Sequence, residues 1–139
     1  MHPISKLLCD AYSELHKQGQ VSFPLHDKHR ASIDTVVKTV HANYFGLERY
    51  PMPQDKAVAY LCYIIKNHPV TDGNKRLALL WFRVYCDVNN LEPQTSVISL
   101  DELAVAIEKE KLLSMSDILR LVQKVLFPVD SDQDLRRAA

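Results

Sequence analysis

Residues 68–76 read His-Pro-Val-Thr-Asp-Gly-Asn-Lys-Arg. This stretch brings a histidine, a carboxylate, a glycine, an amide and two adjacent cations close together in the sequence. Apolar segments with helical spacing flank it on both sides. A polar loop between two buried helices is a suitable place for a site that binds phosphate groups. We therefore treat residues 68–76 as the segment around which the rest of the chain is arranged.

Helical spacing of apolar residues recurs along most of the chain and predicts an all-α fold, a compact bundle of about six helices. The helix after the central stretch is apolar on nearly all sides, so we expect it at the centre of the domain. The helix before the stretch should also be buried on most sides. Only residues 94–98 have strand character. The expected helices cover residues 4–18, 32–44, 54–67, 75–89, 99–108 and 114–127.

Capping residues set the expected ends of these helices. Ser32, Ser99 and Ser114 are predicted N-caps, since a serine hydroxyl can accept a hydrogen bond from a free backbone N–H group. Residues 20–30 read as an irregular connection, in which His26 and His29 are expected to be solvated. We expect a single domain over residues 1–128 and a polar, disordered tail over residues 129–139.

Composition narrows the possible functions. The formal net charge of the 139-residue chain is zero, which argues against a nucleic-acid partner. No apolar run is long enough to span a bilayer, and no signal peptide is recognisable, so we expect neither membrane insertion nor secretion. Cys9, Cys62 and Cys86 show no C-x-x-C spacing and are predicted to be buried, reduced thiols in a cytoplasmic protein.

The residue types of the central stretch suit phosphoryl or nucleotidyl transfer. Gly73 allows a close approach between backbone and ligand, and the helix that follows offers free N–H groups. Asn74, Lys75 and Arg76 add donors and charges for phosphate oxygens. Asp72 could hold Mg²⁺, and His68 could accept a proton from an attacking hydroxyl. The competing interpretation is an ordinary turn with a solvated basic pair, which any one of these residues alone would favour.

Two other kinds of site do not match the stretch. It lacks the G-x-x-x-x-G-K-[ST] pattern and the preceding strand of a Walker loop. The spacing of His68 and Asp72 is too sparse for a structural zinc site. Upstream, residues 43–53 form a loop that is rich in aromatic side chains. From the residues alone, this loop is either pinned to the core or exposed for a partner.

The pattern His68-x-x-x-Asp72-Gly73-Asn74-Lys75-Arg76 between two apolar helices resembles the signature of the Fic/Doc family, which comprises Fic domains and death-on-curing toxins. In layout the resemblance extends over residues 32–127. It implies a small helical bundle that uses ATP and Mg²⁺ to modify a hydroxyl of a target protein. By this resemblance His68 is the general base, Asp72 the Mg²⁺ ligand, and residues 73–76 bind phosphate.

The resemblance also implies a flap that docks the target protein, just upstream of the motif. In this chain the flap comprises Tyr44, Phe45, Gly46, Leu47, Glu48, Arg49 and Tyr50. The family's inhibitory glutamate is followed by glycine or asparagine, and no glutamate here has that neighbour. Inhibition is therefore expected from a separate partner, such as an antitoxin, or from a segment outside this sequence. The chain could also be one domain of a larger protein.

Lys75 and Leu79 bear on which group is transferred. AMP-transferring members of the family usually have a glycine and an arginine at these positions, so the chain is closer to the death-on-curing branch. That branch resembles kinases and implies transfer of phosphate to a Ser or Thr hydroxyl, with AMP transfer as the alternative. Val70 replaces the family's aromatic residue and Leu77 its threonine. These departures leave open a third interpretation, a non-catalytic nucleotide-binding or interaction module.

Overall fold

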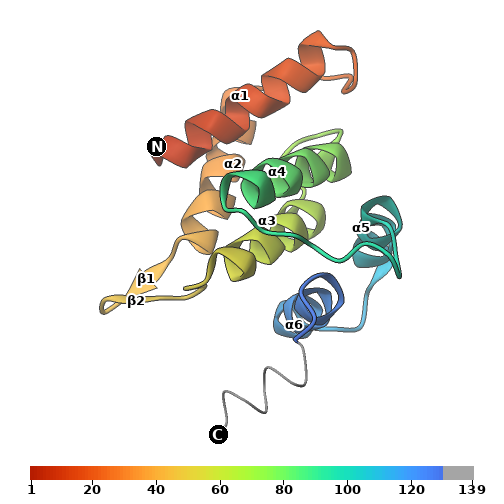
Figure 1. Cartoon of the computed structure of the whole chain (residues 1–139). Helices are drawn as coiled ribbons and strands as arrows, with labels where there is room; N and C mark the ends of the chain where they lie inside the picture. Colours follow the sequence, from red (N-terminus) through yellow and green to blue (C-terminus); the bar gives the residue numbers. More distant parts are fainter. Residues whose placement is uncertain (130–139) are drawn as a thin grey trace, which may run out of the picture.

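The computed structural model describes residues 1–129, so the predicted tail lies, apart from Val129, outside the described residues. Six helices and one short hairpin account for the architecture, and the predicted all-α fold is confirmed (Figure 1). The hairpin pairs Asn43 with Glu48 and Tyr44 with Leu47. The elements are α1 (Pro3–Lys17), α2 (Asp27–Val40), β1 (Asn43–Tyr44), β2 (Leu47–Glu48), α3 (Pro53–Asn67), α4 (Asn74–Val88), α5 (Leu100–Lys109) and α6 (Met115–Leu126).

Helix α3 is the centre of the bundle. It packs against α2, α4, α5 and α6, and every residue from Lys56 to Ile65 is buried. The expectation that α4 occupies the centre is wrong, because one face of α4 lies at the surface: Val84 is 42% and Val88 75% exposed. With Leu7 of α1, these valines line an apolar groove of about 560 Å³. The apolar composition of α3 and α4 predicts burial for both helices, but only α3 has neighbouring helices on most sides.

Most predicted helix ends are confirmed. The hydroxyls of Ser99 and Ser114 accept hydrogen bonds from the N–H groups of Glu102 and Asp117, at 3.1 and 3.2 Å. The predicted N-cap at Ser32 is wrong, since α2 already begins at Asp27. Nδ1 of His29 accepts a hydrogen bond from the N–H of His26 at 3.2 Å, as the third residue of a capping box does.

Residues 94–98 do not form a strand, and the β1–β2 hairpin is the only ladder within residues 1–129. The N–H of Gln94 instead bonds the carbonyl of Leu126 at 2.7 Å, which ties this segment to the end of α6. The three cysteines are buried and free, as predicted. None of the helices in the described part of the chain has the length and hydropathy needed to cross a bilayer.

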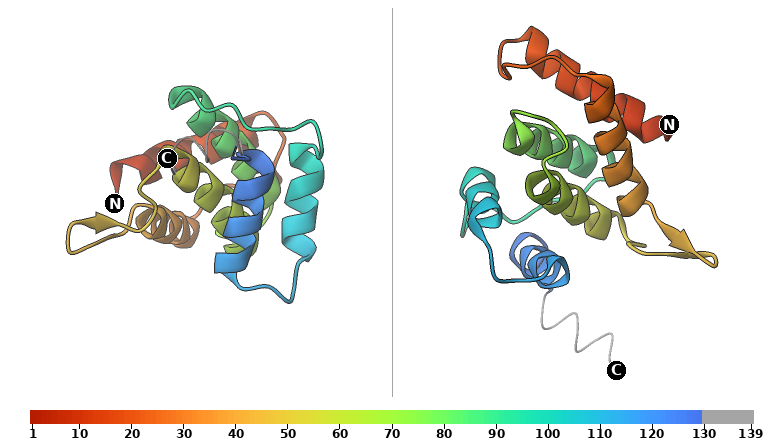
Figure 2. Two further views of the ribbon diagram at one scale, coloured as in Figure 1. Left: turned by 60° about the horizontal axis from the view of Figure 1, so that its bottom comes forward. Right: turned by 180° about the vertical axis from the view of Figure 1, so that it is seen from behind.

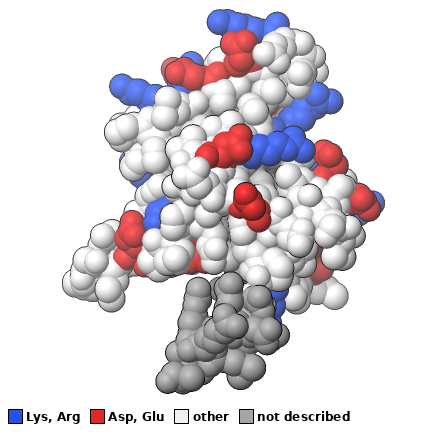
Figure 3. Space-filling model, viewed as in Figure 1, with Lys and Arg blue, Asp and Glu red and all other residues white. Residues whose placement is uncertain are grey.

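The hairpin projects beyond the helices in both views of Figure 2. Phe45 at its turn is fully exposed, and Tyr44 and Leu47 are also exposed. Basic and acidic side chains are interspersed on the face shown in Figure 3, whereas the tip of the hairpin carries neither. Contiguous exposed apolar side chains of this kind often mark a surface that contacts another protein.

Candidate active site

The polar stretch forms the turn between the two best-packed helices, α3 and α4. His68 ends α3 in the left-handed conformation, with φ 49° and ψ 60°. Gly73 begins α4 with φ 83°, a value that favours glycine. No side chain of the described residues caps α4 at this end. The N–H groups of its first turn thus remain available to an anion.

Asn74 holds the turn closed. Its Oδ1 accepts a hydrogen bond from the N–H of Val70 at 3.1 Å, and its Nδ2 donates to the carbonyl of the same residue at 2.9 Å. The Nδ2 atom also lies 3.5 Å from Nδ1 of His68. Val70 itself is buried, so its smaller side chain still packs below the turn. The asparagine therefore links the geometry of the turn to the position of the histidine ring.

The segment between α1 and α2 supports the other side of the turn. The N–H of Ser22 donates a hydrogen bond to Oδ2 of Asp72 at 3.1 Å. Gln20 accepts one from Nη1 of Arg76 at 3.3 Å, and Val21 packs directly against Gly73. None of these contacts is suggested by the sequence, because they join residues about 50 positions apart without any periodic pattern.

His29 also contacts the turn, and its predicted solvation is wrong. The side chain is only 7% exposed, and Nε2 lies 2.9 Å from Oγ1 of Thr71. Since Nδ1 accepts the hydrogen bond from His26, Nε2 carries the proton and donates to the threonine. Burial, together with the nearby His26 and Lys28, lowers the pKa of His29 and favours this neutral form.

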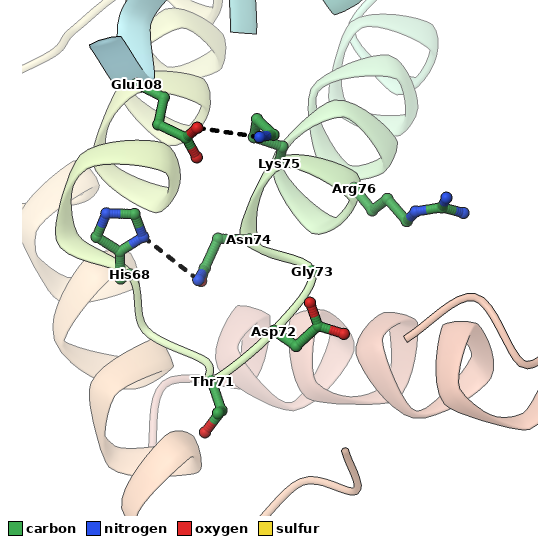
Figure 4. A pocket seen from close by; sticks show the side chains of 8 residues that line it. All are labelled: His68, Thr71, Asp72, Gly73, Asn74, Lys75, Arg76 and Glu108. Carbon is green, nitrogen blue, oxygen red and sulfur yellow. Dashed lines mark hydrogen bonds and ion pairs between the residues drawn. The ribbon is translucent and has the colours of Figure 1, made fainter. Parts of the chain in front are cut away.

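A pocket of about 330 Å³ opens over the turn, within the usual size range of ligand sites. His68, Asn74 and Lys75 point into one space, as Figure 4 shows. The side chains of Asp72 and Arg76 leave the turn on the side away from His68. The lining residues are His68, Thr71, Asp72, Gly73, Asn74, Lys75, Arg76 and Glu108. All predicted residues from 68 to 76 with a chemical role thus line one pocket.

Glu108 of α5 is the lining residue that sequence reasoning missed. Its Oε1 lies 3.0 Å from Nζ of Lys75, and in Figure 4 the carboxylate lies on the same side of the pocket as His68. The hydrogen bond from Lys75 lowers the pKa of Glu108, and the nearby charges of His68 and Lys111 act in the same direction. A glutamate on a predicted helix gives no signal of such a role until the packing of α5 is known.

The donor set agrees with a Mg²⁺ ion that is held mainly by substrate phosphates. Asp72 is the one carboxylate of the turn, and its Oδ2 already accepts the N–H of Ser22. Residues 1–129 contain no group of three or more His, Cys, Asp or Glu side chains that could form an all-protein metal site. Mg²⁺ commonly takes one or two carboxylates, phosphate oxygens and water. Asp72 therefore fits the predicted ligand role.

The predicted flap corresponds to the hairpin, and none of residues 44–50 lines the pocket. Its base is anchored through Lys56, which is buried in the first half of α3. Nζ of Lys56 donates to the carbonyl of Tyr50 and lies 3.3 Å from Oε1 of Glu48. The hydroxyl groups of Tyr50 and Tyr63 are 2.9 Å apart. The sequence left open whether this loop is pinned to the core or exposed. In the structure the base of the hairpin is pinned and its tip is exposed.

A comparison with known proteins places this turn and its helices in a family. The family model described as "Fic/DOC family" matches residues 4–86, from the first turn of α1 to the last turn of α4. The chain belongs to the Fic/DOC family. The match includes the whole of residues 68–76 and most of the helices that support the pocket of this Fic/DOC protein.

Toxin Doc of Mycolicibacterium smegmatis (strain ATCC 700084 / mc(2)155) is 33% identical to the chain over 60 residues. That alignment covers 43% of the chain and 46% of the relative, so the two are similar over less than half of their lengths. No solved structure matches the chain. The resemblance noted from the motif is thus confirmed at the level of the family.

Proposed function

We propose that this Fic/DOC protein transfers the γ-phosphate of ATP to a Ser or Thr hydroxyl of a target protein. The observation that supports this most strongly is the convergence of His68, Asn74 and Lys75 in one pocket at the uncapped start of α4. Family membership and the similarity to Toxin Doc support a transferase of this general type. Transfer of AMP at the same site would use the same pocket and is the principal alternative.

In this proposal the side chains of the turn have separate tasks. His68 accepts the proton of the target hydroxyl while the hydroxyl oxygen forms a bond to the γ-phosphorus, and the bond to the bridging oxygen of ADP breaks. Asn74 orients the histidine through its contact at 3.5 Å. Lys75 and the first N–H groups of α4 bind phosphate oxygens, with Arg76 at the edge of the pocket. Asp72 would hold Mg²⁺, which neutralises phosphate charge.

The exposed hairpin tip supports a role for residues 44–50 in docking the target. Its base is fixed by Lys56 and Tyr63, so the tip can present a defined edge and an apolar side chain, Phe45. An extended peptide can add to such an edge through main-chain hydrogen bonds.

We propose further that the protein acts as a cytoplasmic toxin that is restrained by a separate antitoxin. Expression in a bacterial host should then slow growth, and expression of His68→Ala should not.

Labelled nucleotide distinguishes the possible reactions. The purified chain is incubated with Mg²⁺, a cell lysate and ATP labelled at either the α- or the γ-phosphate. Label transferred from the γ position alone supports the kinase, and label from the α position supports AMP transfer. The intact mass of the modified target checks the result independently. His68→Ala should abolish labelling, whereas His16→Ala, in the last turn of α1 and outside the residues that line the pocket, should not.

Absence of both labels would contradict the proposal and favour a non-catalytic module. Calorimetry then shows whether the chain still binds ATP with Mg²⁺. Such binding without transfer would be the expected behaviour of a nucleotide-binding module.

A further inference from the structure

Glu108 is the one pocket-lining residue, among those described, that lies outside residues 68–76. It comes from α5, beyond the part of the chain that the family model matches. Its carboxylate points toward the ammonium group of Lys75 (Figure 4). The cation proposed to bind phosphate is therefore already paired with an anion of the same protein.

Lys66 fixes α5 in the position that brings Glu108 to the pocket. Nζ of Lys66, in the last turn of α3, donates to the carbonyl of Ile107 at 3.2 Å and to the carbonyl of Glu110. A cation at the free carbonyl groups of a helix C-terminus is a favourable arrangement. Ile107, beside Glu108 in the chain, is buried in the core. The backbone at Glu108 is thus held from both sides, and the carboxylate stays near the pocket when Lys75 moves.

The pair of Lys75 and Glu108 is nevertheless weak enough to exchange partners. The two side chains are 41% and 36% exposed, and exposed ion pairs contribute little to stability. Two cations, Lys75 and Arg76, and two carboxylates, Asp72 and Glu108, line the pocket. Their formal charges cancel. With His68 neutral, the formal charges of the lining side chains sum to zero, so a bare polyphosphate is attracted by the N–H groups at the start of α4 but gains no net attraction from these charges.

We propose that Glu108 is a specificity-determining residue of this site, a resident anion that makes the binding of polyphosphate depend on an accompanying cation. The inference rests on the proposed function in that it takes the pocket to be a phosphate site. A polyphosphate that displaces Glu108 from Lys75 leaves the carboxylate beside it, and the two negative groups repel each other. A divalent cation bound with the polyphosphate and held by Asp72 offsets this repulsion. Free anions are thus disfavoured relative to the metal complex.

Calorimetric titration with inorganic tripolyphosphate at low ionic strength tests the inference. Wild type, Glu108→Gln and Glu108→Ala are each titrated with a metal chelator and, separately, with excess Mg²⁺. Glu108→Gln keeps an oxygen that can accept from Lys75 but removes the charge. We expect it to bind metal-free tripolyphosphate about tenfold more tightly than wild type, and the gain with Mg²⁺ to be clearly smaller.

The matched control is Asp101→Asn, on the same helix and exposed. It changes the net charge equally, and it should bind tripolyphosphate as wild type does. Thermal unfolding of each variant checks that α5 remains folded. Equal or weaker binding by both Glu108 variants, an equal gain in Asp101→Asn, or no binding in any protein would overturn the inference.

A parallel transfer assay with labelled ATP keeps the two proposals separable. Tighter binding by Glu108→Gln without any transfer by wild type would contradict the proposed reaction and leave the inference standing. If wild type transfers label but Glu108→Gln binds tripolyphosphate no more tightly than wild type, only the inference is contradicted.

Discussion

A β-carbon added to Gly73 would overlap Cγ1 of Val21, so the start of α4 and the segment after α1 are in direct contact. The same segment donates a hydrogen bond to Asp72 through Ser22. The hydroxyl of Tyr12 holds it in place by donating to the carbonyl of Phe23 at 2.7 Å. The motif is therefore supported by a part of the chain about 50 residues earlier.

Gly73→Ala should lower the free energy of unfolding by about 2–4 kcal/mol. A left-handed alanine costs about 1–2 kcal/mol. Overlap in a packed region costs about 1–2 kcal/mol at the lower end of its usual range, which gives the total. Urea denaturation measures the change. Gly19→Ala is the matched control, since Gly19 also has a positive φ (72°) but has no atom within 4 Å of the added carbon. Equal losses in the two variants would show that the contact with Val21 is unimportant.

Truncation of Val21 should recover part of the loss. Val21→Ala removes the overlapping methyl groups, so the double variant Val21→Ala/Gly73→Ala should be more stable than the sum of the two single changes implies. A favourable coupling of about 1 kcal/mol is expected for residues in contact. Strict additivity would contradict the packing described between these two residues.

Stability should fall as the pH is lowered through the range in which free histidine titrates. Burial lowers the pKa of His29 below 6.5, and burial with His2 and Lys56 does the same for His41. The unfolded chain therefore takes up protons first, and stability rises with pH across this window. Asp34, whose pKa is lowered by hydrogen bonds from Ser5, Lys38 and His2, acts only at lower pH.

Urea denaturation at about pH 7.5 and about pH 5.5 measures this dependence. His29→Gln should be less stable than wild type at the higher pH, because the bond to Thr71 is altered, and should lose less on acidification. His41→Gln provides the comparison away from the pocket. If the stability of His29→Gln depends on pH as strongly as that of wild type, His29 is not the source of the pH dependence.

Asn74→Asp should damage the turn although the side chain keeps its size. The carboxylate can still accept from the N–H of Val70 but cannot donate to its carbonyl. Loss of this partly buried hydrogen bond should lower the free energy of unfolding by about 1 kcal/mol, and we expect loss of target labelling with it. Asn67→Asp, an exposed position at the end of α3, controls for the charge and should retain labelling.

Phe45→Ser should reduce modification of the target without reducing stability. The side chain is fully exposed and contributes nothing to the core. Labelling from ATP should fall at limiting target concentration and recover as the target concentration rises. Leu112→Ser, at a 94% exposed apolar residue in the α5–α6 connection, is the control. A similar effect of both changes would argue against a specific docking role for the hairpin.

The parts of the fold that depend on local signals could be predicted from the sequence. Periodic apolar residues located the helices, and the serines before Glu102 and Asp117 located two of their starts. The start of α2 differs from the prediction because a histidine, rather than a serine, completes its capping interaction. The composition of α3 and α4 is similar, so only their packing partners could show which helix lies at the centre.

The candidate site was predictable where its residues are adjacent in the chain. His68, Asp72 and Asn74 lie within one turn, so a motif is enough to bring them together. His29 and Glu108 reach the turn through tertiary packing, which single-sequence patterns do not encode. Contacts between helices that are distant in the sequence could therefore not be predicted.

The left-handed conformation of His68 has a consequence for the evolution of the protein. A β-carbon in this conformation lies close to the following carbonyl oxygen and costs about 1–2 kcal/mol, and glycine or asparagine adopts the conformation more readily. Mutations that replace the proposed base with either residue should therefore raise the melting temperature. Selection for stability alone would favour replacement of the histidine, so His68 is expected to persist in relatives only where its chemistry is needed.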